Sequence, residues 1–312
     1  MKILYGIQLT GNGHIRRSLH LINKLRELGH TVDILTSGNG CNLPIESKWK
    51  FTGLTLQYKN GSIDWVKSIF KSKPIRLIKE VKSKLEHYDL VISDFEPVSA
   101  YWAKLNGVKS ISICNQNSIT LTGNNFGLSK WFIKWFAECD HLIGYDYLQT
   151  GNIFQPICNI SLFGRKRGKN ILVYLPYLNN KKVVDLLQKI DLDCIIYTNQ
   201  KLESNGKVVI KKCSEDFTKD LSSCGSVITH SGFSTTSEAL ILGKKIWTIP
   251  VKGQLEQELN CKKLKCMGVY TEGELTLSNL KIWINQWKPI EYKWQDPTDR
   301  VIKKIIEIYE KD

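Results

Sequence analysis

Two polar stretches carry the side chains best suited to chemistry in this chain of 312 residues. The first is GNGHIRR at residues 11–17, where His14 precedes an amphipathic helix pattern that runs from 15 to 28. A neutral imidazole in such a place can accept a proton from a hydroxyl group. The second is HSGFSTTSE at 230–238, where a glycine and several hydroxyl residues join a strand to a helix. Free N–H groups at the start of a helix suit a phosphate group.

Each stretch also has a purely structural interpretation. Thr235 and Glu238 form a T-x-x-E capping box, which needs no ligand. Capping does not explain the other small polar residues, and Gly232 permits a close backbone approach, so the pattern favours a phosphate site. His14 could simply cap its helix. The loop is not the dinucleotide fingerprint, because Arg16 stands where a third glycine is required.

A third candidate is the stretch SDFEP, which ends a strand at 89–94 and supplies Asp94 and Glu96. Carboxylates at the carboxyl end of a strand are candidates for proton transfer, although a plain strand-end turn would look the same. Asn115, in NQNS at the end of the next strand, is a polar candidate for binding an acceptor.

The elements that position these residues alternate between strands and helices. Apolar runs predict strands at 2–8, 31–37, 89–94, 108–115, 141–146, 169–176, 193–199, 207–212, 226–232 and 245–251. Strand–helix–strand order implies parallel sheets covered by helices. We therefore expect an α/β fold of two Rossmann-like, doubly wound domains that face each other across a cleft, with the chemistry in that cleft.

We expect an N-terminal acceptor-binding domain at 1–160, a C-terminal nucleotide-sugar-binding domain at 161–290 and a crossover helix at 291–312. Residues 151–168 show no clear periodicity and contain proline and glycine, which predicts the linker between the two domains there. The last helix begins at the Asp-Pro-Thr signal of 296–298 and is expected to return to the N-terminal domain.

The composition is that of a soluble globular protein with an unusual charge: 44 basic against 30 acidic residues, a net charge of +14. This surplus favours an anionic partner such as nucleic acid, anionic lipid or a phosphorylated substrate. No apolar run is long enough to span a bilayer, and the start does not resemble a signal peptide. Nine cysteines without a C-x-x-C pair indicate reduced thiols in a cytoplasm.

The stretch from His230 to about 264 resembles the donor-binding signature of GT-B glycosyltransferases. It is most similar to the MurG-like enzymes of the glycosyltransferase family 28 type. In that signature a strand and a small-residue loop lead to a helix with a glutamate, then to a strand ending in proline and a Gly-x-x-Glu-Gln turn. The turn here is GQLEQ at 253–257. The resemblance implies a UDP-sugar as co-substrate, with no other cofactor and no metal.

The resemblance also implies roles for individual residues. Glu238 would bind the ribose, and Asp94 would orient His14. The resemblance leaves open whether His14 or Glu96 is the base. The diphosphate and the sugar would be held by Gly13, Ser231, Gly232, Phe233, Ser234, Thr235, Gln254, Glu256 and Gln257. Transfer would invert the anomeric carbon and need no metal, because the helix end stabilises the leaving diphosphate. The only Asp-x-Asp motif, at 191–193, lies at the far end of its strand.

The acceptor is less well defined. Basic residues with aromatic neighbours occur at 65–85 and 128–138, and the acceptor candidates there are Lys73, Arg76, Trp131 and Trp135, with Arg16 near the first loop. The basic residues could bind the phosphates of DNA while an aromatic ring stacks on an extruded base. They could instead bind a membrane surface. A purely structural alternative is that the aromatic residues belong to the core and the lysines form a solvated face. The surplus of positive charge is spread over both halves of the chain, which favours a hydroxymethylated pyrimidine in DNA as the acceptor. The alternatives are a lipid-linked or cell-envelope glycan, and a nucleotide-sugar-binding protein or epimerase. The sequence does not determine the sugar, the base or the oligomeric state.

Overall fold

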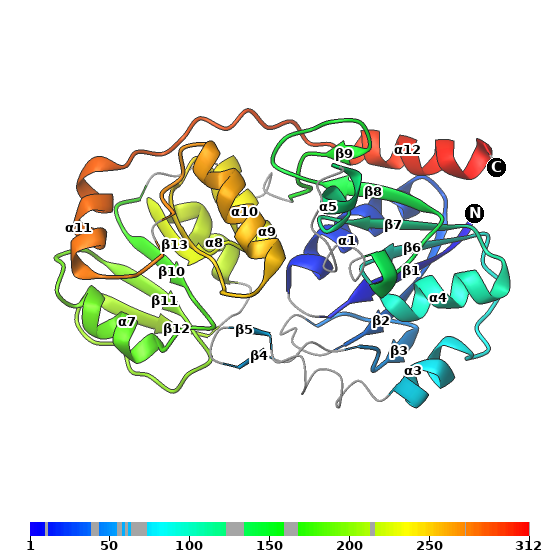
Figure 1. Cartoon of the computed structure of the whole chain (residues 1–312), viewed down its shortest axis with the longest axis horizontal. Coiled ribbons are helices and arrows are strands. Elements are labelled where there is room, and N and C mark those ends of the chain that lie inside the picture. Colours follow the sequence, from blue (N-terminus) through cyan, green and yellow to red (C-terminus); the bar gives the residue numbers. More distant parts are fainter. Residues whose placement is uncertain are drawn as a thin grey trace. The chain divides into compact units, whose positions relative to one another are not determined.

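The structure is a computed structural model that describes residues 1–9, 12–38, 44–54, 58–59, 62–63, 74–122, 134–158, 168–212, 216–271 and 273–311. The chain forms two compact units, each described here by itself. Unit 1 comprises Met1–Gln57, Asp64–Asn159 and Gln295–Asp312, and unit 2 comprises Tyr58–Ile63 and Ile160–Trp294. Figure 1 shows the elements of both units.

Unit 1 is built on a parallel sheet of seven strands in the order β3-β2-β1-β6-β7-β8-β9. Its strands are β1 (Lys2–Gln8), β2 (Thr31–Ser37), β3 (Trp49–Phe51), β6 (Leu90–Asp94), β7 (Ser110–Cys114), β8 (His141–Tyr145) and β9 (Ile153–Phe154). Its helices are α1 (Asn12–Glu27), α3 (Pro74–Val81), α4 (Pro97–Asn106), α5 (Asn117–Leu121) and α12 (Thr298–Lys311).

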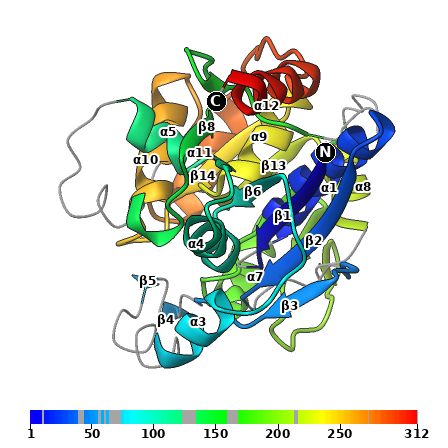
Figure 2. The same cartoon turned by 90° about the vertical axis from the view of Figure 1, so that its right-hand side faces the viewer.

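Both faces of this sheet are covered, because successive side chains of a strand point to opposite faces. Leu4 of β1 packs in a cluster with Val98 and Trp102 of α4, whereas the neighbouring Tyr5 lies beside Ser18 of α1. Figure 2 shows β1 between α4 and α1. The near-continuous apolar run of β1 is thus the pattern of a strand buried on both faces.

The C-terminal helix α12 belongs to unit 1, where it contacts α1. Its buried residues Val301, Ile302, Ile305 and Ile308 recur at helical spacing, and the side chain of Asp296 accepts hydrogen bonds from the backbone N–H and hydroxyl of Thr298. The Asp-Pro-Thr start and the return of this helix to the N-terminal part of the chain are therefore confirmed.

Unit 2 repeats the plan with a parallel sheet of five strands in the order β12-β11-β10-β13-β14. Its strands are β10 (Ile171–Tyr174), β11 (Cys194–Tyr197), β12 (Val208–Lys211), β13 (Ser226–His230) and β14 (Lys245–Ile249), with an antiparallel hairpin of β4 (Tyr58–Lys59) and β5 (Ser62–Ile63). Its helices are α7 (Asn180–Leu187), α8 (Asp216–Ser223), α9 (Phe233–Ile241), α10 (Leu255–Cys266) and α11 (Leu277–Gln286).

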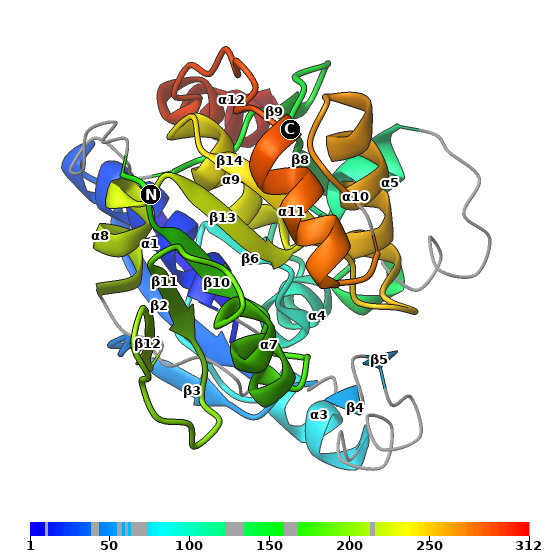
Figure 3. The ribbon, with the colours of Figure 1, turned by 90° about the vertical axis from the view of Figure 1, so that its left-hand side faces the viewer.

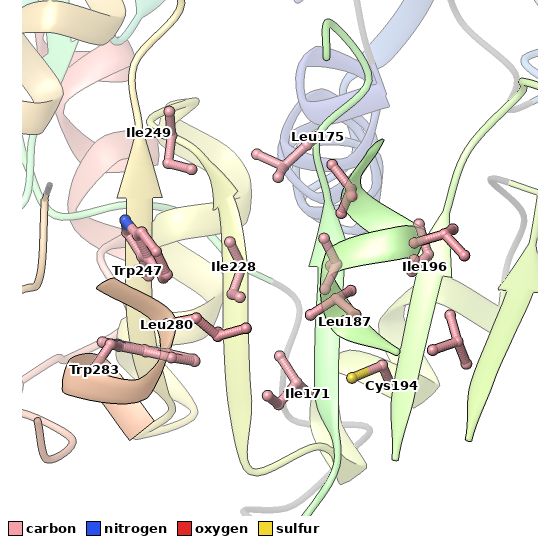
Figure 4. Packing of buried hydrophobic residues seen from close by; sticks show 14 of the residues in the cluster. Ile171, Leu175, Leu187, Cys194, Ile196, Ile228, Trp247, Ile249, Leu280 and Trp283 are labelled. Carbon is pink, nitrogen blue, oxygen red and sulfur yellow. The ribbon is translucent and has the colours of Figure 1, made fainter. Parts of the chain in front are cut away.

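The main core of unit 2 lies between its sheet and the helices α7 and α11, which cover one face (Figure 3). Trp247 of β14 packs against Trp283 of α11 with ring centroids 5.8 Å apart, and both side chains are fully buried. Leu280 and Ile228 complete this part of the core (Figure 4). Burial of such aromatic side chains stabilises the sheet whose carboxyl end carries the candidate phosphate loop.

The predicted fold is confirmed as an α/β fold with two Rossmann-like, parallel-sheet units. All ten predicted strands are present, with bounds that differ by a few residues. One expectation was wrong: residues 151–158 are not plain linker, because β9 lies there at the edge of the unit 1 sheet. A strand of two residues is too short to produce a periodic pattern. Residues 159–167 of the expected linker lie outside the described residues.

Candidate active site

His14 and Asp94 meet at the carboxyl edge of the unit 1 sheet. His14 lies in the first turn of α1 and Asp94 is the last residue of β6, and the imidazole Nδ1 is 2.8 Å from the Asp94 Oδ1. Helix α1 already begins at Asn12, and the His14 ring contacts the carboxylate, so the interpretation of His14 as a simple helix cap was wrong. With Nδ1 on the carboxylate, the nitrogen that can take a proton is Nε2.

Arg17, which was not among the predicted site residues, also binds Asp94. Its Nε donates to Oδ2 at 2.7 Å and its Nη2 to Oδ1 at 2.5 Å, which forms a bidentate pair. The Arg17 side chain is only 6% exposed, and Ser18 donates to the same carboxylate at 2.9 Å. The spacing of His14 and Arg17, one helical turn apart on one face, was the available signal.

Asp94 is ionised despite its burial. Burial acts to raise the pKa of this carboxyl group, but the charge of Arg17, followed by His14 and the hydrogen bonds of both, lowers it to about 2. The carboxylate is therefore a fixed negative charge beside His14. The side chain of Asn115, which is also buried, accepts from Arg17 Nη1 at 3.3 Å.

Glu96 serves as the N-cap of α4 rather than facing solvent. Its carboxylate accepts from the backbone N–H groups of Val98 at 2.8 Å and Ser99 at 2.6 Å, and from the Ser37 hydroxyl at 2.5 Å. The side chain is fully buried, and burial raises its pKa in spite of these hydrogen bonds. Between Asp94 and Glu96, Phe95 has a left-handed φ of 53° and its ring stacks on Phe136. This geometry favours His14 over Glu96 as the base.

The candidate phosphate loop lies at the carboxyl end of β13 in unit 2. Helix α9 begins at Phe233 with Gly232 as its N-cap, so Thr235 lies inside the first turn. The capping-box interpretation of Thr235 and Glu238 was therefore wrong, since a capping box requires the first residue at the N-cap. The first turn also contains Ser234, and the N-cap residue Gly232 makes no side-chain hydrogen bond to the helix. The Phe233 side chain is buried, so the predicted contact of this residue with an anion cannot come from its ring.

Neither the packing nor the backbone conformation requires a glycine at position 232. Its φ is −66°, which any residue adopts, and a Cβ built at this position meets no atom within 4 Å. Two neighbouring polar atoms are buried without a protein partner among the described residues, namely His230 Nε2 and Ser231 Oγ. Buried polar groups nearly always have hydrogen-bond partners, so open space beside two unpartnered atoms is typical of a ligand site.

His230, which the sequence analysis did not single out, has a defined tautomer. Its Nδ1 is 2.7 Å from the carbonyl oxygen of Ile249, so Nδ1 carries the proton and Nε2 presents a lone pair. Burial lowers the pKa of His230, although the hydrogen bond to Ile249 opposes this effect. The histidine is therefore neutral. Its position directly before Ser231 was a signal in the sequence.

Helix α10 supports the same loop. Asn260 Nδ2 donates to the carbonyl oxygen of Ser231 at 3.1 Å. Among the predicted sugar-binding residues, Gln257 is buried and its Oε1 accepts from Val251 N at 3.1 Å. Gln254 is the N-cap of α10, and its buried Oε1 has no partner among the described residues. Glu256 lies in the first turn of α10 and Glu238 in α9, both half-buried.

The remaining predicted residues fall in three groups. Gly13 and Arg16 lie in the first turn or two of α1 and are half-buried. Arg76 of α3 is 3.5 Å from Glu80, and Trp135 is 45% exposed with its ring against Tyr101. Lys73 and Trp131 lie outside the described residues.

Two further observations concern the described part of the chain alone. It contains no group of three or more His, Cys, Asp and Glu side chains arranged to hold a metal ion. None of its helices combines the length and apolar character that crossing a bilayer requires.

Two parallel-sheet units, each with a polar strand-end site, define a protein of the GT-B glycosyltransferase fold. The model of glycosyl transferase family 1 matches residues 1–134 and 147–286, so the chain belongs to this family. The resemblance to GT-B glycosyltransferases is confirmed, and the protein is an enzyme of glycosyl transfer. The closer likeness to MurG-like, family 28 enzymes stays a prediction.

Solved structures agree on the fold. The chain is similar to the glycosyltransferase SnogD from Streptomyces nogalater, with 14% identity, a TM-score of 0.55 and coverage of 99% of this chain and 95% of that chain. It is similar to Arabidopsis thaliana UGT89C1 complexed with UDP, with 13% identity, a TM-score of 0.58 and coverage of 99% and 94%. The glycosyltransferase VinC in complex with dTDP matches with 13% identity, a TM-score of 0.55 and coverage of 100% and 96%. A search of curated protein sequences found no significant match.

Proposed function

We propose that the enzyme transfers a hexose from a nucleotide sugar whose diphosphate binds at the N-terminus of α9. The observation that carries this proposal is the open space at Gly232, the N-cap of α9, next to the unpartnered His230 Nε2 and Ser231 Oγ. The helix dipole and the backbone N–H groups of Ser234 and Thr235, in the first turn of α9, attract a diphosphate there. Glu238 would hold the ribose hydroxyls, and Gln254, Glu256 and Gln257 the sugar, with Gln257 acting through its amide nitrogen.

The donor nucleotide is proposed to be UDP, carrying glucose or N-acetylglucosamine. UGT89C1 was crystallised with UDP and VinC with dTDP, so structures of this fold hold pyrimidine nucleoside diphosphates. A helix N-terminus recognises the diphosphate that these nucleotides share and does not distinguish their bases.

The chemistry at His14 is proposed to be general base catalysis. The acceptor hydroxyl gives its proton to His14 Nε2 while its oxygen bonds to the anomeric carbon, and the bond from that carbon to the diphosphate breaks. The electron pair leaves with the diphosphate, and the configuration inverts. Asp94, 2.8 Å from Nδ1, stabilises the imidazolium that forms. The positive end of α9 meets the charge on the diphosphate, so we propose that no metal and no other cofactor is required.

The favoured acceptor is a hydroxymethylated pyrimidine in DNA. The net charge of +14 supports an anionic macromolecule. A cavity of about 380 Å³ in unit 1, lined by Phe95, Asn117, Lys134 and Cys139 among others, offers room for an extruded base. Trp135, which follows the cavity-lining Lys134 in the chain, is 45% exposed and could offer an aromatic ring for stacking.

A second candidate acceptor is a lipid-linked or cell-envelope glycan, and helix α3 favours it. Ile75 and Ile78 are 72% and 54% exposed on α3, and Lys79 and Lys82 are exposed beside them. Apolar side chains flanked by lysines suit the interface of an anionic membrane. The reaction would then take place at the membrane surface, with the protein bound peripherally. The seven cysteines in the described residues are free thiols, which supports a cytoplasmic location in either case.

The experiment that tests the function uses purified enzyme without added metal. UDP-glucose or UDP-N-acetylglucosamine is incubated with DNA containing 5-hydroxymethylcytosine or 5-hydroxymethyluracil, and the nucleosides are analysed by mass spectrometry. A gain of one hexose that disappears in His14→Ala and Glu238→Ala supports the DNA acceptor.

The same preparation is then tested with membrane extracts and anionic vesicles. UDP release on extracts, with sedimentation that is lost in Ile75→Ser/Ile78→Ser, moves the assignment to the envelope glycan. Salt-sensitive binding to random duplex DNA supports the first acceptor instead. Binding of UDP-sugars without release of UDP in any mixture would leave the third alternative, a binding protein or an epimerase.

A further inference from the structure

His230, the last residue of β13, has one ring nitrogen bonded and the other without a partner. Its Nδ1 donates to the carbonyl oxygen of Ile249 at 2.7 Å, and its Nε2 has no hydrogen-bond partner among the described residues. The residue is only 5% exposed. A buried nitrogen without a partner is costly, because buried polar groups nearly always form hydrogen bonds. The structure therefore points to a ligand that completes the bonding of His230.

The chain places this nitrogen beside the proposed diphosphate site. Residues 230–232 lead from the end of β13 to the N-cap of α9, where Gly232 leaves open space. A diphosphate that joins a nucleoside to a sugar carries only acceptor oxygens near neutral pH. A neutral imidazole with its proton on Nδ1 also presents an acceptor at Nε2, so the two cannot form a hydrogen bond. A protonated Nε2 would instead donate to a phosphate oxygen in a charge-assisted bond.

The described side chains packed around His230 contribute no charge to it. The ring of Tyr177, in the segment after β10, lies against the imidazole with centroids 5.5 Å apart. Strand β14 contributes the Ile249 carbonyl, and α10 contributes the neutral Asn260, which binds the next residue of the loop. Tyr177 is half-buried, so it is the side chain whose movement could open Nε2 to a ligand.

His230 is therefore neutral in the free protein. Burial lowers its pKa, and the hydrogen bond to Ile249 opposes this effect. The carboxylates on the next two helices, Glu238 of α9 and Glu256 and Glu258 of α10, are not among the causes that act on this pKa. A bound diphosphate would thus be the first opposite charge to act on the imidazole, and such a charge favours the imidazolium.

We propose that His230 takes up a proton when the diphosphate of the nucleotide sugar binds, and that its Nε2–H then donates to a phosphate oxygen. This inference rests on the proposed place of the diphosphate at the N-terminus of α9. The proton comes from water and stays on His230 while the bond from the anomeric carbon to the diphosphate breaks. The imidazolium then stabilises the charge of the leaving diphosphate. The proton returns to water when the nucleoside diphosphate dissociates.

Calorimetric titration with UDP-glucose, in the absence of any acceptor, counts this proton. The diphosphate of UDP-glucose does not itself titrate near neutral pH, so proton uptake reports on the protein. The heat is compared at pH 7 in two buffers of different ionisation enthalpy. We expect uptake of about half a proton, since a nearby opposite charge raises a histidine pKa by about one unit or more. As the pH rises through neutrality, the affinity should fall by up to about tenfold per pH unit.

Two variants assign the proton to His230. In His230→Asn, the amide can keep the bond to Ile249 but lacks Nε2, so proton uptake should vanish and the affinity should no longer depend on pH. In Tyr177→Ala, the imidazole is uncovered, burial lowers its pKa less, and uptake at pH 7 should be smaller. His87→Asn is the matched control, because the His87 side chain is 88% exposed, and its uptake should equal that of the intact protein.

The outcomes separate this inference from the proposed function. Binding of UDP-glucose without proton uptake would overturn the inference, and Nε2 would then accept from a hydroxyl of the ligand. Unchanged uptake in His230→Asn would overturn it as well. If that variant does not fold, the intact protein still decides the first point. Proton-linked binding without sugar transfer in any mixture would support the inference and tell against the function. Failure of both UDP-glucose and UDP-N-acetylglucosamine to bind would overturn both.

Discussion

His14 and Asp94 are 80 positions apart in the chain, and in the fold the imidazole Nδ1 lies 2.8 Å from the carboxylate Oδ1. The contact arises because β1 pairs with β6 in the sheet, so that α1, which follows β1, begins beside the end of β6. An imidazole held by a buried carboxylate can take a proton at its other nitrogen. This relationship is the basis of the first prediction.

Substitution of His14 by alanine should remove general base catalysis. We expect kcat to fall by about 10²–10⁴-fold, because a positioned base contributes that much. The affinity for a nucleoside diphosphate should stay the same, because the proposed diphosphate site is built from unit 2. The measurements are steady-state kinetics and calorimetric titration with UDP. His20→Ala is the matched control, since His20 lies on the same helix but contacts Thr298 of α12. Full activity in His14→Ala would contradict the assignment.

Substitution of Gly232 by valine should weaken the binding of the sugar donor without unfolding the protein. The backbone at Gly232 suits any residue and an added Cβ meets no atom within 4 Å, so the melting temperature should change little. The side chain would instead occupy the space of the diphosphate, and KM for the donor should rise by about tenfold or more, as expected for the loss of one charge-assisted contact. Gly273→Val is the control, because Gly273 is equally open in unit 2. An unchanged KM would place the diphosphate elsewhere.

Substitution of Asp94 by asparagine should destabilise unit 1. It leaves the buried Arg17 charge without its partner, which typically costs about 3–5 kcal/mol. The pKa of Asp94 is lowered from 3.8 to about 2 in the folded protein, so its stabilising effect is complete above pH 4 and is lost as the pH falls toward 2. Denaturant unfolding from pH 7 to pH 2 tests both statements. The intact protein should lose stability in that acid window, and Asp94→Asn should lose less there.

A surface ion pair provides the control for that experiment. Asp191 binds Lys207 at 2.5 Å, but its side chain is 93% exposed. Asp191→Asn should therefore leave the melting temperature almost unchanged, because solvent screens such pairs. If both asparagine variants behaved alike, the buried pair would have no special role in stability.

Substitution of Glu96 by alanine should affect stability more than the chemistry. The carboxylate caps α4 through Val98 and Ser99, and loss of such a cap costs about 1–2 kcal/mol. We expect a lower melting temperature, with the acid limb of the pH–rate profile at its original position in the folded fraction. Loss of that limb would instead identify Glu96 as the base.

Removal of divalent metal should leave the transfer rate unchanged. The proposed charge stabilisation comes from the N-terminus of α9, which a chelator does not alter. Initial rates with and without EDTA, at saturating donor, are the measurement. A loss of activity that magnesium or manganese restores would show that a cation shares this role.

The sequence by itself determined the ten longer strands, the two parallel sheets and the stretch that holds the candidate phosphate loop. Those features depend on local rules: apolar runs form buried strands, and the spacing from β13 through α9 to the turn at 253–257 is fixed along the chain. For the same reason, local patterns were enough to single out His14 and the residues from Ser231 to Glu238.

Only the tertiary structure decided which partner each polar residue contacts. Asp94 and Glu96 are two residues apart and look alike in sequence, yet Asp94 turns to His14 and Arg17 whereas Glu96 turns back to cap α4. The left-handed backbone at Phe95 separates them, and a local pattern does not reveal it. Arg17 is one of two adjacent arginines in the stretch 11–17, and only the neighbouring strand end, brought close by strand pairing, makes it a buried partner of Asp94. Such contacts depend on the pairing of strands that are far apart in the sequence, so a local pattern cannot predict them.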